Sequence, residues 1–158
     1  MKTHFLFPAS YRRVGWVLFV PGLVLGSIMT GFDALNEVAE LPVFAIWDGG
    51  ILSKSVVMGV THNNVVDEIA VTLIVIGGML TGFARTPDED EFIGSIRYES
   101  LVWAMYFNFG LVLATTLFLY GTAYWYFMLL NIIGMLVFFV CRFHYKLYQL
   151  RKSYRDEE

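Results

Sequence analysis

Residues 124–141 read YWYFMLLNIIGMLVFFVC, and Arg142 follows this run directly. An uncharged apolar stretch of about 18 residues or more predicts a helix that spans a membrane. Three further stretches, at 14–32, 65–84 and 101–120, are similarly apolar. The chain of 158 residues is 57% hydrophobic, whereas soluble domains are about 45–50% apolar. We therefore predict an all-α membrane protein, a four-transmembrane-helix bundle that forms a single domain over 1–158.

The basic residues divide unevenly between the two sides that these stretches define. Ten of the 11 Lys and Arg residues lie on one side, and only Lys54 lies on the other. Cytoplasmic loops retain Lys and Arg. We therefore expect a multi-pass membrane protein with both termini in the cytoplasm. The first stretch, 14–32, is longer than a typical signal core, so we expect a retained helix rather than a cleaved leader.

The predicted helices cover 14–32, 65–84, 87–120 and 124–154, and the loop 33–64 faces outward. Within this loop, an apolar run at 42–47, an Asp-Gly-Gly turn at 48–50 and a β-rich run at 51–59 predict a small β-hairpin. The alternative is an irregular cap that Trp47 anchors at the interface.

Two helix starts carry capping signals. Asn64 followed by Asp67 predicts a capping box at the start of the second helix. For the third helix, Thr86 is the predicted cap, Pro87 suits the first helical position, and Glu89 completes the box. The third and fourth helices are expected to extend beyond the bilayer into the cytoplasm.

Small residues recur at four-residue spacing on three of the helices. In lipid, such residues let helix backbones approach closely. One interpretation is that subunits associate through one of these faces, and the other is packing within one four-helix bundle. The predicted packing residues are Gly22, Gly26 and Thr30 on the first helix, Gly78 and Gly82 on the second, and Gly110, with Ala114 one turn later, on the third.

The deepest polar side chains are amides and hydroxyls, and no charged residue or histidine lies at the predicted bilayer centre. Counting about 1.5 Å per residue from the helix ends, we predict two buried hydrogen bonds, Thr72–Asn131 and Thr81–Asn108. A structural role for these pairs is one interpretation, and a transport pathway is the other. Proton-coupled carriers usually place an ionisable group at this depth, so its absence argues against that class.

Three charges lie near the cytoplasmic interface. Glu99 and Arg142 fall at the same height on two helices, which predicts an ion pair. Arg97 is two residues from Glu99 and faces away from it, so Arg97 requires another partner, such as a neighbouring acid, a lipid headgroup or a protein. The sequence identifies no catalytic residue, no cofactor site and no metal-ligand set. The single Cys, Cys141, excludes an internal disulfide.

Three segments carry a resemblance to other proteins. They read NNVVDEI at 63–69, DEFIGSIRYESLVWA at 90–104 and FFVCRF at 138–143. Together they resemble an uncharacterised family of small bacterial four-helix inner-membrane proteins, and the second segment is the most specific. The resemblance implies the topology and a bacterial origin, but no activity, ligand or catalytic residue.

These observations lead to three hypotheses about function. The first is a non-enzymatic interaction, regulatory or accessory subunit whose partners are membrane lipids and either a second copy or another membrane protein. The second is a small transporter or channel formed at an oligomer interface. The third is a membrane enzyme that uses Arg97, Glu99 and Arg142 on a lipid-like substrate, which requires a cavity at that height. No long basic tract suggests a nucleic-acid partner.

Overall fold

The structure is a computed structural model that describes residues 5–31, 40–48, 56–87 and 89–156. It contains four helices that are long and apolar enough to cross a membrane. A two-stranded antiparallel sheet lies between the first two helices in the chain. In chain order the elements are α1 (Tyr11–Gly31), β1 (Glu40–Asp48), β2 (Val56–Asn64), α2 (Val66–Phe83), α3 (Glu91–Phe118) and α4 (Thr122–Asp156).

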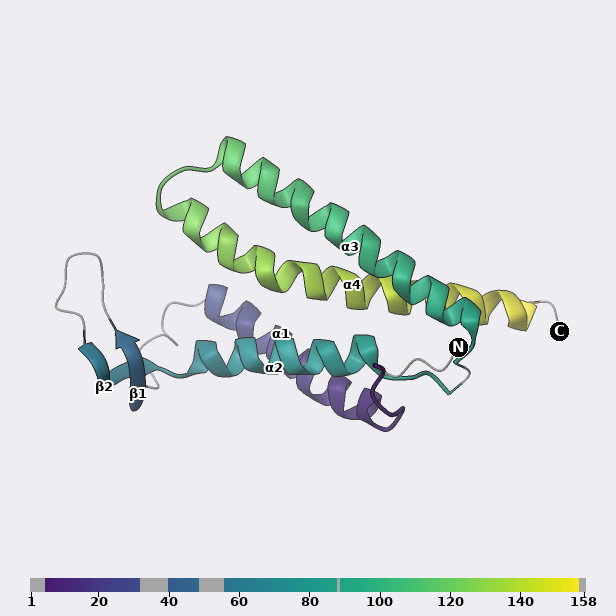
Figure 1. The fold of residues 1–158 in the computed structure, drawn as a ribbon, viewed down its shortest axis with the longest axis horizontal. Helices are drawn as coiled ribbons and strands as arrows, with labels where there is room; N and C mark the ends of the chain where they lie inside the picture. Colours follow the sequence, from purple (N-terminus) through teal and green to yellow (C-terminus); the bar gives the residue numbers. More distant parts are fainter. Residues whose placement is uncertain (1–4, 32–39, 49–55, 88, 157–158) are drawn as a thin grey trace.

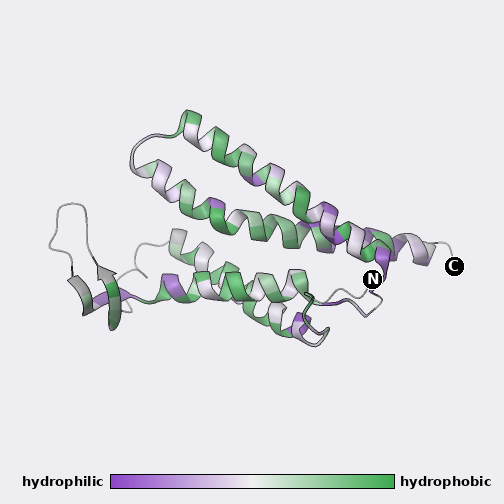
Figure 2. Ribbon diagram, in the orientation of Figure 1, coloured by the Kyte–Doolittle hydropathy of each residue, from purple (hydrophilic) through white to green (hydrophobic). Residues whose placement is uncertain are grey.

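The helices run alternately in opposite directions along the molecule (Figure 1). The start of α1, the linker between α2 and α3, and the end of α4 therefore lie at one end. We call this the basic end, because it holds the described Arg and Lys side chains. The opposite end carries β1, β2 and the α3–α4 turn, and we call it the hairpin end. Apolar residues dominate the helices between these two ends (Figure 2).

The predicted β-hairpin is confirmed, but its second strand begins later than expected. The register pairs Glu40 with Asn64 and Asp48 with Val56. The strands are therefore joined by residues 49–55, and the predicted Asp-Gly-Gly turn at 48–50 falls mostly on this connection. The residues of that connection lie outside the described part of the chain.

The start of α3 differs from the prediction. The helix begins at Glu91, and the Asp90 side chain caps it by accepting a hydrogen bond from the Ile93 N–H at 2.7 Å. Pro87 is therefore not the first helical residue. Glu89 still accepts a hydrogen bond from the Thr86 N–H at 2.8 Å, as in a capping box. That contact forms in the extended linker because Glu89 also binds a distant arginine, as described below.

The capping box predicted for α2 is also wrong. The Val66 N–H donates to Asn64 Oδ1 at 3.0 Å, whereas a capping box would use the N–H of Asp67, one residue later. Asp67 accepts from the neighbouring Glu68 N–H at 3.1 Å, and Val65 occupies the N-cap position. At the other end of the bundle, α1 begins at Tyr11, one turn earlier than predicted, and α4 extends over Thr122–Asp156.

The helices α1 and α2 pack backbone to backbone. A Cβ added at Gly15 would lie 2.7 Å from the Thr81 backbone nitrogen, and one at Gly77 would overlap the Phe19 backbone. A Cβ added at Gly22 would lie 2.9 Å from the Ile74 backbone nitrogen. Contacts of this kind require residues without side chains, so these glycines set the separation of the two helices.

The helices α3 and α4 form a second hairpin through larger side chains. Phe107 and Phe138 stack with ring centroids 4.4 Å apart, and Gly121, with a φ of 69°, makes the turn. The two hairpins meet chiefly through α2 and α4, whereas α3 packs mainly on α4. A buried apolar cluster joins all four helices; it comprises Phe19, Ile74, Ile93, Ala104, Phe139, Val140, Phe143 and Leu147.

Candidate functional site at the basic end

Arg97 is the centre of the hydrogen bonding at the basic end. Its side chain reaches from α3 to the end of α2, where Nε donates to the Gly82 carbonyl at 3.2 Å and Nη2 donates to the Ala84 carbonyl at 3.3 Å. The guanidinium also forms a two-point ion pair with Glu89, with Nη1–Oε1 at 2.5 Å and Nη2–Oε2 at 3.0 Å. Arg97 is only 5% exposed. This arrangement, the Arg97 clasp, joins the last turn of α2, the linker and α3.

Two further contacts hold the Arg97 clasp in place. The Phe143 ring of α4 lies 4.8 Å from the Arg97 guanidinium carbon, a cation–π distance. The segment before α1 also pairs with the linker, since the Phe7 N–H donates to the Phe83 carbonyl and the Arg85 N–H donates to the Phe7 carbonyl. The linker is therefore fixed from both sides, by α3 and by the segment before α1.

Glu89 is ionised in this setting. Burial alone raises the pKa of its carboxyl, but hydrogen bonds from Arg97 and Thr86 and the charge of Arg97 outweigh that effect. The pKa of Glu89 therefore lies below its ordinary value. Arg97 and Glu89 share two hydrogen bonds, and Arg97 has two carbonyl partners as well. These contacts offset the free energy that removing the two charges from water costs.

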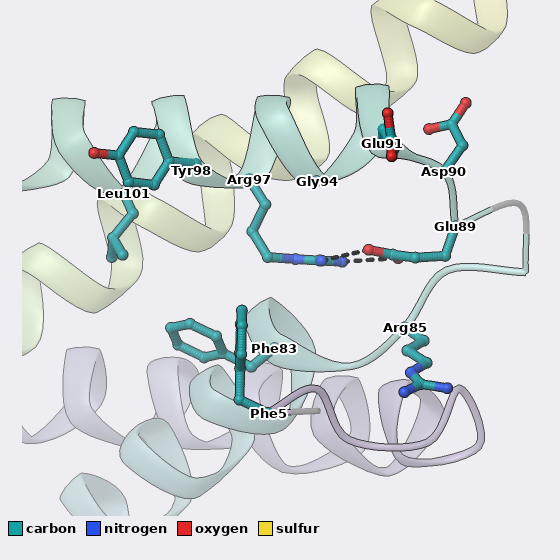
Figure 3. A pocket seen from close by; sticks show the side chains of 10 residues that line it. All are labelled: Phe5, Phe83, Arg85, Glu89, Asp90, Glu91, Gly94, Arg97, Tyr98 and Leu101. Carbon is teal, nitrogen blue, oxygen red and sulfur yellow. Dashed lines mark hydrogen bonds and ion pairs between the residues drawn. The ribbon is translucent and has the colours of Figure 1, made fainter. Parts of the chain in front are cut away.

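A cavity of about 700 Å³ opens beside the Arg97 clasp, between α3 and the end of α2. Phe83, Tyr98 and Leu101 line its apolar part, and Arg85, Asp90 and Glu91 line its polar part (Figure 3). This volume is within the range of about 300–1,000 Å³ found for small-molecule sites. The cavity is therefore of a size that small molecules occupy, with both apolar and charged side chains on its walls.

The predicted contact between Glu99 and Arg142 is present. Their closest atoms, Oε1 and Nη2, are 2.6 Å apart, and the Glu99 side chain is 55% exposed. The Arg142 guanidinium carbon also lies 5.1 Å from the Trp103 ring centroid. Neither Glu99 nor Arg142 lines the cavity. The structure thus separates the three interface charges into the buried Arg97 clasp and an exposed ion pair.

The predicted packing glycines divide into two groups. Gly22 and Gly26 face Ile74 of α2, Gly78 faces Leu136 of α4, and Gly82 faces the Phe139 ring of α4. An added Cβ at Gly110, in contrast, would meet no described atom within 4 Å. Thr30 lies in α1, and its side chain is outside the described part of the chain.

Neither predicted polar pair forms a hydrogen bond. Among the described residues, the buried Thr81 Oγ1, Asn108 Oδ1 and Asn131 Oδ1 have no hydrogen-bond partner. Thr81 and Asn108 do not meet because α3 packs mainly on α4. Thr72 is exposed and lines a shallow groove beside Ile132 and Ile133 of α4. The predicted depth of Thr72 agrees with its position beside α4. The predicted rotation of the helices about their axes is wrong, so the side chains do not face each other.

Comparison with known protein families, with curated proteins and with solved structures finds no match. Among the described residues, no three His, Cys, Asp or Glu side chains are grouped so that they could hold a metal ion. The residues that sequence reasoning missed are Glu89 as the partner of Arg97, and the tight contact of Gly15 with Gly77. The available signal for the first was an acid eight residues before an arginine that needed a partner.

Proposed function

We propose that this chain is a non-enzymatic integral membrane protein that acts as an interaction, regulatory or accessory subunit and associates through α3. In this proposal it resides in the bacterial inner membrane with the basic end in the cytoplasm. The proposal depends on one observation: the small-residue face of α3 at Gly110 has no neighbour within the described chain.

The face around Gly110 has the properties of a helix contact surface. Tyr106, Gly110, Leu113 and Leu117 recur at helical spacing, and the three side chains are 68%, 64% and 64% exposed in that order. Ala114, one turn after Gly110, is also exposed. The other predicted small-residue pairs, Gly22–Gly26 and Gly78–Gly82, already serve contacts within the chain. Of the three predicted faces, the Gly110 face is therefore the one that a partner helix can approach closely.

The geometry supports the other two hypotheses less well. An enzyme that uses Arg97, Glu99 and Arg142 would need them to converge, but only Arg97 reaches the cavity. Four hydrogen bonds within the chain already engage the Arg97 guanidinium. A transport path along Asn108 and Asn131 would need accessible amides, whereas Asn131 is 7% exposed and the Asn108 carbonyl oxygen is buried.

The proposal can be tested by site-specific photo-crosslinking in native membranes. A photoreactive residue at Leu113 should trap a second copy or another membrane protein. The matched control is Ile132 on α4, which is exposed to a similar extent, 72% against 64% for Leu113, but lies on a different helix. Gly110→Leu should abolish the Leu113 adduct and leave helicity unchanged. If Leu113 traps only lipid, or if both positions trap protein equally, association through α3 is wrong.

A further inference from the structure

The first turns of α1 lie against α4 at the basic end. The Trp16 ring meets the His144 ring edge-on, with ring centroids 5.0 Å apart. Arg12 lies one helical turn before Trp16, and residues at this spacing share a helix face. Arg151 likewise lies about two turns after His144 on the same face of α4. Because α1 begins and α4 ends at the basic end (Figure 1), both arginines lie outward of the ring contact.

Positive charge accumulates between these two helix segments without a compensating acid. Arg12 and Arg151 are close enough for their charges to repel each other, and both disfavour a positive charge on His144. Among the described residues, no ion pair joins an acid to Arg12 or to Arg151. Two cations that repel each other, with no acid between them, favour the binding of an anion between them.

Two nitrogen atoms of this cluster are shielded from water and have no hydrogen-bond partner among the described residues. They are Arg12 Nη1 and His144 Nε2. His144 Nδ1 lies 2.9 Å from the Val140 carbonyl oxygen, which can only accept, so Nδ1 carries the proton. Withdrawing part of a guanidinium from water without a partner costs free energy. Arg12 as a whole is only partly buried, so a bound anion can offset that cost through the accessible part of the side chain.

The depth of the cluster indicates which anion it meets. Trp16 is 37% exposed, and tryptophan is enriched at the membrane–water interface. Counting along the helices, Arg12 lies about 6 Å outward of Trp16 and Arg151 about 10 Å outward of His144. The headgroup region on each side of a bilayer is about 5–8 Å thick, which long arginine side chains reach from these positions. Phosphate is the anion of that layer, and a guanidinium binds it through two parallel hydrogen bonds.

We propose that Arg12 and Arg151, with His144 beside them, bind the phosphate group of an anionic ligand between α1 and α4. This inference goes beyond the proposed function, since it concerns neither α3 nor the Gly110 face. Such a phosphate belongs either to an anionic lipid headgroup or to a soluble phosphate compound, and the two sources give different results in the same experiment.

Native mass spectrometry of the delipidated full chain tests the proposal. The probes are phosphatidylglycerol and phosphatidylcholine with identical acyl chains, and inorganic phosphate without lipid. Phosphatidylglycerol should bind about tenfold more tightly, because the quaternary ammonium of phosphatidylcholine adds a positive charge to the cluster. That preference assigns the site to a lipid headgroup. Binding of inorganic phosphate without a preference between the lipids assigns it to a soluble phosphate compound.

Two double variants separate a specific site from the general positive charge of the basic end. Arg12→Gln with Arg151→Gln should weaken binding of the phosphate probe by about tenfold or more, since it removes the charge-assisted hydrogen bonds. The matched control is Arg13→Gln with Lys152→Gln, which removes the same charge from exposed neighbouring positions. The control should change the affinity by less than about threefold.

A stability measurement distinguishes a binding role from a structural one. In the lipid-free protein, Arg12→Gln with Arg151→Gln removes a repulsion and no hydrogen bond within the described chain. This variant should therefore unfold at the same temperature as the unmodified chain or at a higher one, when helicity is followed in non-ionic detergent. A binding site that is strained without its ligand behaves in this way.

Three results would overturn the proposal. The first is the absence of both a lipid preference and phosphate binding in the unmodified chain. The second is an equal loss of affinity in the two double variants. The third is a lower unfolding temperature of the lipid-free Arg12→Gln/Arg151→Gln variant, which would mean that the arginines hold the fold. Crosslinking at Leu113 uses none of these residues, so the two proposals fail independently.

Discussion

Glu89→Gln is the most informative single change, because it removes one charge from the Arg97 clasp and keeps the side-chain shape. The glutamine can still accept one hydrogen bond from Arg97, but the arginine charge stays buried at 5% exposure without an opposite charge. Breaking a buried pair by removing one partner costs about 3–5 kcal/mol. We expect Glu89→Gln to lower the free energy of unfolding by about 3 kcal/mol, at the lower end of that range. The loss is not larger because Arg97 keeps its hydrogen bonds to the Gly82 and Ala84 carbonyls.

The matched control is Glu99→Gln, the same substitution in the exposed ion pair on α3. The Glu99 side chain is 55% exposed, and exposed pairs contribute about 0–1 kcal/mol. The free energy of unfolding is measured by titrating detergent-solubilised protein with SDS and following helicity. Equal losses for the two variants, or a loss below about 1 kcal/mol for Glu89→Gln, would refute the assignment of Arg97 and Glu89 as a buried, stabilising pair.

Three further predictions use the same unfolding assay. The pKa of Glu89 is lower in the folded state than its ordinary value of 4.5, so the stabilisation from ionised Glu89 is complete above pH 4.5. The free energy of unfolding should fall as the pH drops below that value, and Glu89→Gln should flatten this pH dependence. Gly77→Ala should cost about 2–3 kcal/mol by overpacking α1 against α2, whereas Gly94→Ala should be neutral or gain up to about 1 kcal/mol of helix propensity; similar values would contradict the close α1–α2 contact. Thr81→Val should cost nothing or stabilise by up to about 1 kcal/mol, because the buried hydroxyl has no partner among the described residues, and a loss above that amount would show that the hydroxyl is bonded.

The sequence predicted the spans and the Glu99–Arg142 contact for a shared physical reason. Both depend on depth along a helix axis, which increases by a fixed amount per residue. Hydrophobic length located the four helices to within a few residues at most ends. The β-hairpin between α1 and α2 could also be predicted from the sequence, because β-rich runs beside a turn signal are local features.

Other features depend on helix rotation and on contacts across the linker. Thr81 and Asn108 share a predicted depth, but α3 packs mainly on α4. In the sequence Glu89 looks like a capping residue, because a capping box and an ion pair with a distant arginine both use a glutamate carboxylate. Only the path of the linker brings it to Arg97.

The sequence by itself determined that four helices are long and apolar enough to cross a membrane and that the basic residues gather at one end. Tertiary structure alone decided which faces meet: glycines of α1 against α2, Arg97 against Glu89, and Gly110 against nothing in the described chain. The physical reason is that burial in lipid is a property of each residue, whereas the choice of neighbour depends on how whole helices rotate and cross.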